Sequence, residues 1–446
     1  MGRNIYTGEQ VCADPASWFR AGMISNPSMF LEAIPGIGKT TLVQRMLLGL
    51  AGYGLTPMVF GDIRPDYAHT TRALDGQVIR IGGGTGHVNP LDKGVAPELV
   101  EKVLAEAARV RAAGGPWERI RELEDAATEI EQDARQRRIE RVMTLVRTSR
   151  GRAPEDTEYN VVSASLDLLD ANGYSPSHVL GDLLEVVRSG HEALMEIVDV
   201  DNPQDYRVAV RSLVTTLVGL VKGTRFGDLF AKPTTEPMRL DRAVCFDVSQ
   251  LRQTGEAREA AGLAVCWSYG TGNIAAAQVA ADVGVIPRRL YALVFDELHR
   301  VLRAAKGMVE VVDQSTRLNR TDGTALFLIT HSVKDLLALP DPDDRAKAEG
   351  FVDRVGMFVC GGATGAELSA LQEKVPFSAS ERDLITRWSA PPPRREDGSE
   401  GTPPGRGKFL IKIGGASNVP GVPIELTLTS AEQRLRTSGY RWQEAA

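Results

Sequence analysis

The sequence has no excess of basic residues, no cysteine framework and no long uninterrupted apolar run. Its 52 Lys and Arg residues stand against 58 Asp and Glu residues, which gives a net charge of −6. Charge alone therefore predicts no general nucleic-acid-binding surface, and any such contact must be local or arise on assembly. The cysteines at positions 12, 245, 266 and 360 have neither metal-ligand nor disulfide spacing, which is typical of a reducing compartment.

The N-terminal residues lack an apolar signal core, and Tyr6 occupies the position where a myristoylation motif needs Ser or Thr. Export and lipidation are therefore not expected. The longest uncharged stretch, 260–281, is interrupted by polar and glycine residues at 268–273, which favours a buried helix over a membrane span. With 43% hydrophobic and 25% charged residues the composition is globular, and we predict a cytoplasmic location.

Strand-like apolar runs alternate with helix-period segments at both ends of the sequence. In the first 95 residues the order is strand, glycine loop, helix and strand, at 29–32, 33–40, 41–50 and 57–60. Further strand-like runs lie at 243–247, 290–295, 325–330, 354–359, 408–413 and 422–428. This alternation predicts an α/β fold with a mostly parallel sheet, built from residues 1–95 and 226–446.

The middle of the sequence, residues 96–225, is nearly all helical in pattern and is predicted to form a helical insertion domain. It contains a run of arginines between positions 135 and 152, which can bind an acidic partner but is more typical of a solvated helix face. Near the C-terminus, the stretch 390–407 is rich in Pro and Gly and is predicted to be a mobile loop.

The segment Ala33-Ile-Pro-Gly-Ile-Gly-Lys-Thr40 matches the P-loop pattern, with Ala in place of its first Gly, between a predicted strand and helix. Its two later glycines let backbone N–H groups curl around a phosphate at a helix N-terminus. We expect Lys39 to bridge the β- and γ-phosphates of ATP and the Thr40 hydroxyl to ligate Mg²⁺, whereas the alternative is a glycine-rich turn without a ligand. The predicted nucleotide-binding residues are Ala33, Pro35, Gly36, Ile37, Gly38, Lys39, Thr40 and Thr41.

A second motif, Leu290-Tyr-Ala-Leu-Val-Phe-Asp-Glu297, ends an apolar strand with two carboxylates and has the Walker B arrangement. Asp296 is predicted to hold the Mg²⁺ shell. Glu297 is predicted to orient or deprotonate the attacking water, because Glu directly after that Asp is typical of hydrolysing motors. The alternative is an acidic pair that only caps the next helix.

Three further side chains complete the predicted catalytic set. His331 follows the strand at 325–330 and is a candidate γ-phosphate sensor, although a lone His is often structural. Arg317 and Arg320 lie at a predicted helix end and are candidate arginine fingers that reach the nucleotide of a neighbouring subunit. Ordinary surface salt bridges are the alternative for both arginines.

Taken in order, these motifs resemble the HerA/FtsK superfamily of ring ATPases, and more narrowly the TraC-like ATPases of conjugation and type IV secretion. Family-like segments also lie at 61–67, 89–92, 246–249, 330–335, 407–410 and 422–432. The family usually has Gln where His331 stands, and its larger members carry an N-terminal channel-docking domain that is not recognisable here. The resemblance implies a RecA-like P-loop NTPase core with an all-helical insertion, Mg²⁺ and ATP as cofactors, and a hexamer at the inner face of the cell membrane.

The resemblance also implies partners: a separately encoded membrane-embedded channel or docking subunit, and DNA or a relaxase–DNA complex. We therefore predict an ATP-hydrolysing motor that energises assembly of, or substrate transfer through, a conjugation or type IV secretion channel. Two alternatives remain open. A DNA translocase or coupling protein would pump the strand itself and hydrolyse ATP faster with DNA, and an ATP-switched scaffold would show little turnover.

Overall fold

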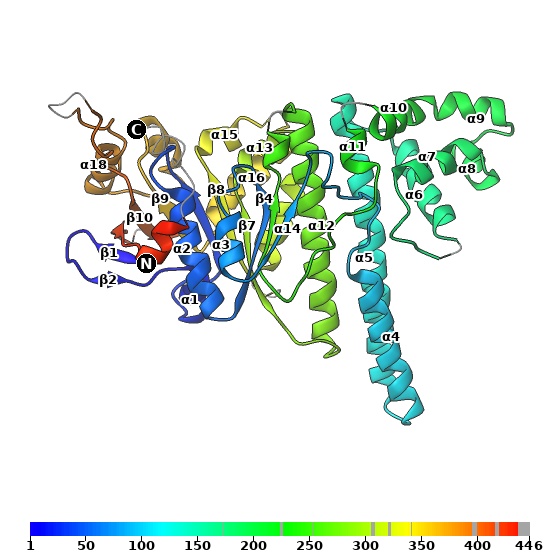
Figure 1. Cartoon of the computed structure of the whole chain (residues 1–446), viewed down its shortest axis with the longest axis horizontal. Coiled ribbons are helices and arrows are strands. Elements are labelled where there is room, and N and C mark those ends of the chain that lie inside the picture. Colours follow the sequence, from blue (N-terminus) through cyan, green and yellow to red (C-terminus); the bar gives the residue numbers. More distant parts are fainter. Residues whose placement is uncertain are drawn as a thin grey trace.

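The computed structural model describes residues 1–171, 173–223, 226–252, 254–304, 308–319, 323–339, 341–394, 399–414 and 419–435. Its centre is an 11-stranded sheet with the order β2-β1-β11-β10-β9-β3-β8-β7-β4-β6-β5 (Figure 1). The strands are β1 (Gly2–Asn4), β2 (Gln10–Val11), β3 (Ser28–Glu32), β4 (Leu55–Asp62), β5 (Gln77–Arg80), β6 (Val244–Asp247), β7 (Leu290–Phe295), β8 (Thr324–Thr330), β9 (Met357–Cys360), β10 (Lys408–Ile413) and β11 (Val422–Leu426).

From β9 to β5 each strand is parallel to the next, and from β2 to β9 each strand is antiparallel to the next. The predicted α/β class with a mostly parallel sheet is therefore confirmed. Strands β3 and β8 are buried along their whole length, as expected for parallel strands covered on both faces. Their side chains alternate between two cores, so that Met29 and Phe30 contribute to opposite faces of the sheet.

Helices cover both faces. Outside the helical region they are α1 (Pro15–Arg20), α2 (Lys39–Gly52), α3 (Ala68–Ala73), the 3-10 helix η1 (Ser249–Leu251), α12 (Glu256–Asp282), α13 (Leu298–Ala304), α14 (Met308–Leu318), α15 (Val333–Leu337), α16 (Pro342–Arg354), α17 (Gly365–Leu371), α18 (Ala379–Trp388) and α19 (Ser430–Arg434). Leu42 and Met46 of α2 pack on one face, and Leu263 and Trp267 of α12 pack on the other. The buried helix expected at 260–281 is confirmed as part of α12, and none of the described helices is long and apolar enough to cross a membrane.

Eight helices lie between β5 and β6 in the described part of the chain and gather at one end of the molecule (Figure 1). They are α4 (Ala96–Ala112), α5 (Trp117–Arg150), α6 (Asp156–Leu169), α7 (Leu180–Ser189), α8 (Glu192–Ile197), α9 (Pro203–Ala209), α10 (Arg211–Lys222) and α11 (Gly227–Phe230). The first half of α5 and all of α4 form an arm, residues 96–134, that projects from the body of the molecule. Leu123, Ala127 and Ile130 of the arm pack against Ala276 and Ala280 of α12.

Two of the arginines interpreted as part of a solvated helix face are buried instead. Arg138 forms an ion pair with Asp170, with Nη1 and Oδ2 2.5 Å apart. Arg141 donates to the carbonyl oxygens of Pro90 at 2.9 Å and Asp92 at 2.6 Å. The solvated-face interpretation was wrong for these two positions, because their partners come from segments that fold against α5 from elsewhere in the chain. Arg141 fixes the loop that follows β5 to the helical region.

Candidate nucleotide-binding site

The chain turns from β3 into α2 through a loop in which two positions have backbone conformations that favour glycine. Gly36 and Gly38 have φ of 86° and 109°, in the left-handed region that other residues rarely adopt. Gly38 precedes the first residue of α2, and no side chain caps the free N–H groups of this helix end. The 14-residue helix therefore presents its positive end and its unpaired donors to whatever lies above the loop.

The Lys39 ammonium folds back under the loop in this structure. Its Nζ donates to the carbonyl oxygen of Ala33 at 2.5 Å and lies 2.5 Å from Nδ1 of His331. Burial lowers the pKa of Lys39 to about 8, against the opposing effect of the charges on Asp296 and Glu297. A buried ammonium beside two carboxylates is an arrangement found where charge has a function.

Asp296 and Glu297 follow β7 directly, at the carboxyl edge of the sheet. Tyr67 donates its hydroxyl hydrogen to Oδ2 of Asp296 at 3.0 Å. Burial raises the pKa of Asp296 to about 6, and the charge of Glu297 adds to the rise. Glu297 itself has φ of 51°, a strained value for a residue with a side chain, and its N–H donates to Oδ1 of Asp296 at 2.8 Å.

The Glu297 carboxylate is surrounded by positively charged or hydrogen-bonding groups. Its oxygens lie 3.0 Å from Nε2 of His331, 3.8 Å from His299, and 3.9 Å from each of Arg300 and Arg64. Burial raises its pKa, but the hydrogen bond from His331 and the surrounding positive groups outweigh that effect and hold the pKa at about 2. Glu297 is therefore ionised throughout the physiological range.

His331 connects the two predicted catalytic groups. Because the ammonium of Lys39 can only donate, Nδ1 of His331 must accept, and Nε2–H then donates to Oε1 of Glu297. This fixes the neutral tautomer with hydrogen on Nε2. A Gln side chain, which the resembling family has at this position, offers the same acceptor and donor through its amide. The change from Gln to His thus preserves the polarity of the connection.

The predicted residues converge on one cavity of about 410 Å³. Of the predicted set, the residues that line it are Pro35, Gly36, Gly38, Lys39, Thr40, Thr41, Asp296, Glu297 and His331. Ala33 and Ile37 do not line it, because their side chains are buried in the core beneath the loop. Arg320 lies outside the described residues, as does the side chain of Arg317, whose backbone belongs to α14.

Residues without a predicted role also line this cavity, and five of them lie at the end of β4 or directly after it. Asp62 accepts hydrogen bonds from the backbone N–H groups of Asp66, Tyr67 and Ala68, which holds Tyr67 against Asp296. Burial raises the pKa of Asp62 to about 7. The signal was present in the sequence, since 61–67 follows a strand that ends at the same sheet edge as Asp296. The motif resemblance marked the segment but gave no contacts.

The chain also returns over the phosphate loop from the stretch predicted to be a mobile loop. Gly407 donates its N–H to the carbonyl oxygen of Ile37 at 2.8 Å, and Gly405 is buried close to Trp388. Pro403 and Arg406 thereby line the cavity. The end of that stretch is packed rather than loose, which corrects the prediction of a mobile loop there. Local composition could not reveal this, because the contact joins Gly407 to Ile37, far apart in the sequence.

The residues present fit a nucleotide and Mg²⁺. An uncapped helix N-terminus, a left-handed glycine loop and a buried ammonium meet at one cavity, where Oε2 of Glu297 is buried without a hydrogen bond from a described residue. Thr40 and Asp296 line the same cavity and supply the oxygen ligands that Mg²⁺ prefers. Among the described residues no cluster of three or more His, Cys, Asp or Glu side chains could hold a metal. Mg²⁺ bound here would share its remaining ligands with phosphate and water.

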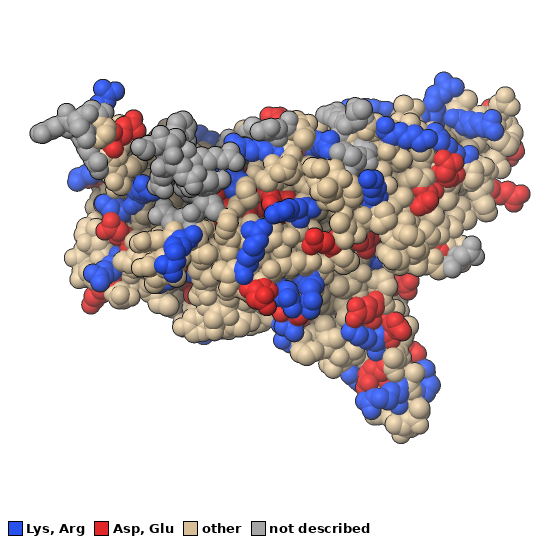
Figure 2. Space-filling model, viewed as in Figure 1, with Lys and Arg blue, Asp and Glu red and all other residues tan. Residues whose placement is uncertain are grey.

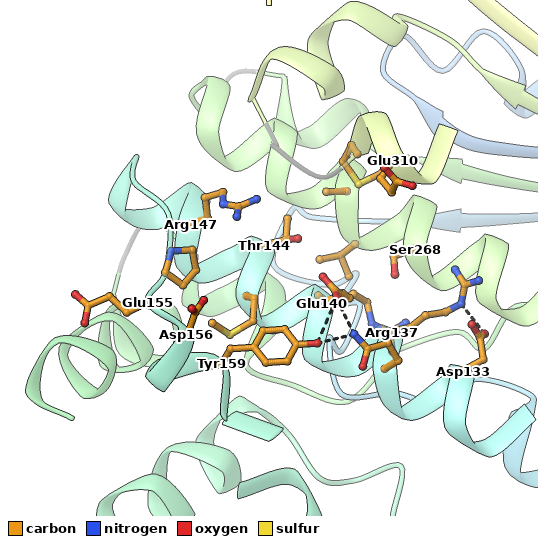
Figure 3. Close-up of a pocket in the computed structure, with 17 residues that line it drawn as sticks. Asp133, Arg137, Glu140, Thr144, Arg147, Glu155, Asp156, Tyr159, Ser268 and Glu310 are labelled. Atoms are coloured by element: carbon orange, nitrogen blue, oxygen red, sulfur yellow. Dashed lines mark hydrogen bonds and ion pairs between the residues drawn. The ribbon is translucent and has the colours of Figure 1, made fainter. Parts of the chain in front are cut away.

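A larger cavity of about 630 Å³ lies between the helical region and the α/β core, with α5 and α6 on one side and α12 and α14 on the other (Figure 3). Several of its polar side chains bond to one another. Arg137 pairs with Asp133 at 2.6 Å, and Gln136 donates to Glu140 at 2.7 Å and to the Tyr159 hydroxyl at 2.5 Å. Chemistry rather than volume therefore assigns the nucleotide to the smaller cavity.

Comparisons with known proteins bear on the fold. No family model and no curated protein matches the sequence. Among solved structures, VirB4 of Thermoanaerobacter pseudethanolicus superposes with a TM-score of 0.66 at 19% sequence identity, over 97% of each chain. The plasmid coupling protein TrwB in complex with ADP and Mg²⁺ gives a TM-score of 0.49 at 12% identity, over 93% of this chain and 89% of that one, too weak a likeness to say more. The chain therefore has the fold of VirB4, which confirms, for the fold, the RecA-like architecture implied by the sequence.

Proposed function

We propose that this chain is a Mg²⁺-dependent ATPase that belongs with VirB4 and powers a conjugation or type IV secretion channel. The observation that carries the proposal is a pair of hydrogen bonds that links Lys39 through His331 to Glu297. Lys39 is the first residue of α2, and no side chain caps this end of the helix. The fold shared with VirB4 over nearly the full length of both chains supports it. The segments that resemble TraC-like ATPases in the sequence point the same way.

In this proposal each residue has a defined task. Lys39 leaves Ala33 and His331 to bind the β- and γ-phosphates, and the N–H groups at the start of α2 bind the β-phosphate. Thr40 and Asp296 would hold Mg²⁺, which when bound would supply positive charge to the phosphates. Glu297 accepts the hydrogen bond of the attacking water.

His331 couples nucleotide arrival to the basicity of Glu297. While Lys39 donates to His331, the imidazole holds Glu297 in a low-pKa state that is a weak base. Once Lys39 moves to the phosphates, His331 is free to reorient. Loss of its hydrogen bond removes the first of the influences that lower the pKa of Glu297, so the pKa rises, while His299 and Arg300 still oppose the effect of burial. The sensor role proposed for His331 follows from this sequence of exchanges.

The assembly is proposed from the resemblance of the sequence motifs to ring ATPases of conjugation and type IV secretion. Six copies form a ring at the inner face of the membrane, bound to a membrane-embedded channel subunit, and Arg320 or Arg317 completes the site of the adjacent copy. DNA or a relaxase–DNA complex is a candidate substrate.

The test is phosphate release from ATP by the purified chain across a range of protein concentrations, with Mg²⁺ or EDTA and with or without DNA. The proposal predicts turnover that needs Mg²⁺, rises in specific activity with concentration and responds little to DNA. Strong stimulation by DNA would instead favour a translocase or coupling protein. ATP binding without turnover under every condition would favour an ATP-switched scaffold.

A further inference from the structure

A groove runs along the arm where the first turns of α5 meet the last turns of α12. Its volume is about 480 Å³, and it is far in the fold from the phosphate loop (Figure 1). We call it the arm groove. It is lined by Trp117, Glu118, Arg121, Glu122, Asp125, Ala126 and Glu129 of α5 and by Val279, Asp282 and Val283 at the end of α12.

The groove has an apolar component that the fold leaves uncovered. Trp117, the first residue of α5, is 65% exposed and is the largest of the exposed hydrophobic side chains in the described part of the chain. Val279 and Ala126 continue the apolar lining toward the body of the molecule. An indole left in water at the edge of a groove is the type of residue that dominates the affinity of protein–protein interfaces.

The rim of the groove is acidic. Glu118, Glu122, Asp125 and Glu129 recur at helical spacing on one face of α5, and the lining contains only one basic residue, Arg121. The arm carries side chains of both signs (Figure 2), but those that line the groove are mostly negative.

Part of this charge is not neutralised within the chain. Glu122 pairs with Arg119, Asp125 with Arg121 and Asp282 with Arg288. Glu118 and Glu129 form neither an ion pair nor a hydrogen bond with any described residue. Two free carboxylates thus line the same groove as the exposed tryptophan, Glu118 next to it in the chain and Glu129 about three helical turns further along α5. This sign of charge repels a phosphate backbone and attracts a cationic segment.

We infer that the arm groove binds a basic amphipathic segment of a protein partner. An apolar side chain of that segment packs on Trp117, and its Lys or Arg side chains pair with Glu118 and Glu129. The origin of the segment rests on the proposed function: it is a cytoplasmic tail of the membrane-embedded channel subunit. Cytoplasmic segments of membrane proteins carry an excess of Lys and Arg close to the bilayer. Their positive charge is therefore complementary to the acidic lining of the groove.

The two components of the groove make different contributions. The carboxylates steer the partner and make its association rate sensitive to salt, whereas the indole sets the lifetime of the complex. Binding through Glu118 and Glu129 alone would be lost at high ionic strength, since exposed pairs are strongly screened. Contact with Trp117 would persist.

The experiment measures fluorescence anisotropy of a labelled helical peptide with Lys on one face and Leu on the other, titrated with the full chain. The test variant is Glu118→Lys/Glu129→Lys. The matched control is Glu101→Lys/Glu131→Lys, which changes the net charge equally at two exposed positions of the arm outside the groove. The inference predicts about tenfold or greater loss of peptide affinity in the test variant and less than about threefold in the control.

A third variant, Trp117→Ala, separates groove binding from general charge attraction. This variant should bind the peptide with Lys and Leu faces more weakly. Its affinity for a peptide of equal charge that has Ser in place of Leu should not change. Equal losses in the test and control variants, or no effect of Trp117→Ala, would overturn the inference. Tighter binding of a DNA oligonucleotide than of the peptide to the wild-type groove would overturn it as well.

Failure of the inference is distinguishable from failure of the proposed function. All three variants lie outside the nucleotide cavity, so their Mg²⁺-dependent phosphate release should match the wild type. A chain that releases phosphate but shows no groove-dependent peptide binding refutes the groove alone. A chain that binds the peptide through the groove but never hydrolyses ATP keeps the docking surface and refutes the motor.

Discussion

At the end of β7 the single carboxylate of Glu297 lies 3.0 Å from His331, 3.8 Å from His299 and 3.9 Å from Arg300. On the arm, by contrast, each ion pair joins one acid to one base on the helix surface, as in Glu98 with Lys102 at 2.6 Å. Both regions are rich in charge. The nucleotide site gathers several partners around one buried group, whereas the ion pairs of the arm each join two side chains at the water-exposed surface.

The difference shows how charge that performs chemistry can be told from charge that keeps a surface soluble. Exposed matched pairs contribute little energy, because water and salt screen them and ordering two long side chains costs entropy. A buried carboxylate on a strained backbone costs folding energy, and such a cost is typical of positions where the arrangement serves a function. Glu297 meets that description.

The largest effect is expected from Glu297→Gln. The amide can hold a water molecule but cannot accept its proton, so turnover should fall by about 10² to 10⁴-fold while nucleotide affinity is retained. Phosphate release and nucleotide binding are measured on the same preparation. Turnover within a few-fold of the wild type would move the catalytic role to another residue.

A buried ion pair in the helical region should behave differently both from Glu297 and from the exposed ion pairs of the arm. Arg150 donates to both oxygens of Glu158, at 2.7 and 2.9 Å, and both side chains are 9% exposed. Arg150→Ala leaves a buried carboxylate unpaired and should lower the free energy of unfolding by about 3 to 5 kcal/mol, with turnover of the folded protein unchanged. Urea unfolding followed by circular dichroism measures the loss.

Two controls sharpen that measurement. Arg152→Ala removes an exposed arginine close to the same turn and should change the unfolding free energy by less than about 1 kcal/mol. The double variant Arg150→Met/Glu158→Leu removes both charges and should recover most of the stability. A double variant as unstable as Arg150→Ala would mean that lost packing, rather than an unpaired charge, explains the effect.

The nucleotide site should also respond to pH through Lys39, whose pKa is about 8 without nucleotide. Contact with phosphates raises that pKa, so affinity is fully present below pH 8 and falls by up to about tenfold per pH unit above it. Titrations with ATP at pH 7.5, 8.5 and 9.5 measure the change. Lys39→Arg keeps its charge over this range, and any binding it retains should not vary with pH. The same slope in both proteins would assign the effect to another group.

The smallest effect is expected on the arm. Lys102→Ala removes one member of an exposed pair and should change the unfolding free energy by less than about 0.5 kcal/mol, with unchanged turnover. A loss comparable to that of Arg150→Ala would erase the distinction between the arm and the buried pairs. Thermal or urea unfolding at low and high salt provides the comparison.

The sequence predicted the parts of the site that follow strands directly. Asp296 and His331 each come just after an apolar run, and Lys39 follows another after the loop 33–38. Parallel strands end at one edge of the sheet, so the convergence of the three residues was predictable. The boundaries of some elements were not, as at β9, where helix α16 continues to Arg354 and the strand begins three residues later, at Met357.

The remaining features depend on contacts between distant segments. Arg406 reaches the nucleotide cavity only because Gly407 binds the backbone of Ile37, and no local pattern reports that contact. Arg141 is buried because the carbonyls of Pro90 and Asp92 meet it across the fold. Arg406 stays exposed while it borders the cavity, whereas Arg141 has the residue type of a surface position and is buried by tertiary packing.

The most direct test of the account is a calorimetric titration of ATP with Mg²⁺ into the wild-type chain and into Lys39→Ala. Lys39 borders the cavity at the N-terminus of α2 and is expected at the phosphates. The account predicts binding to the wild type, and a loss of at least about tenfold in affinity for the variant without a change in its circular dichroism. Equal affinity in the two proteins would contradict the assignment of the nucleotide to this loop.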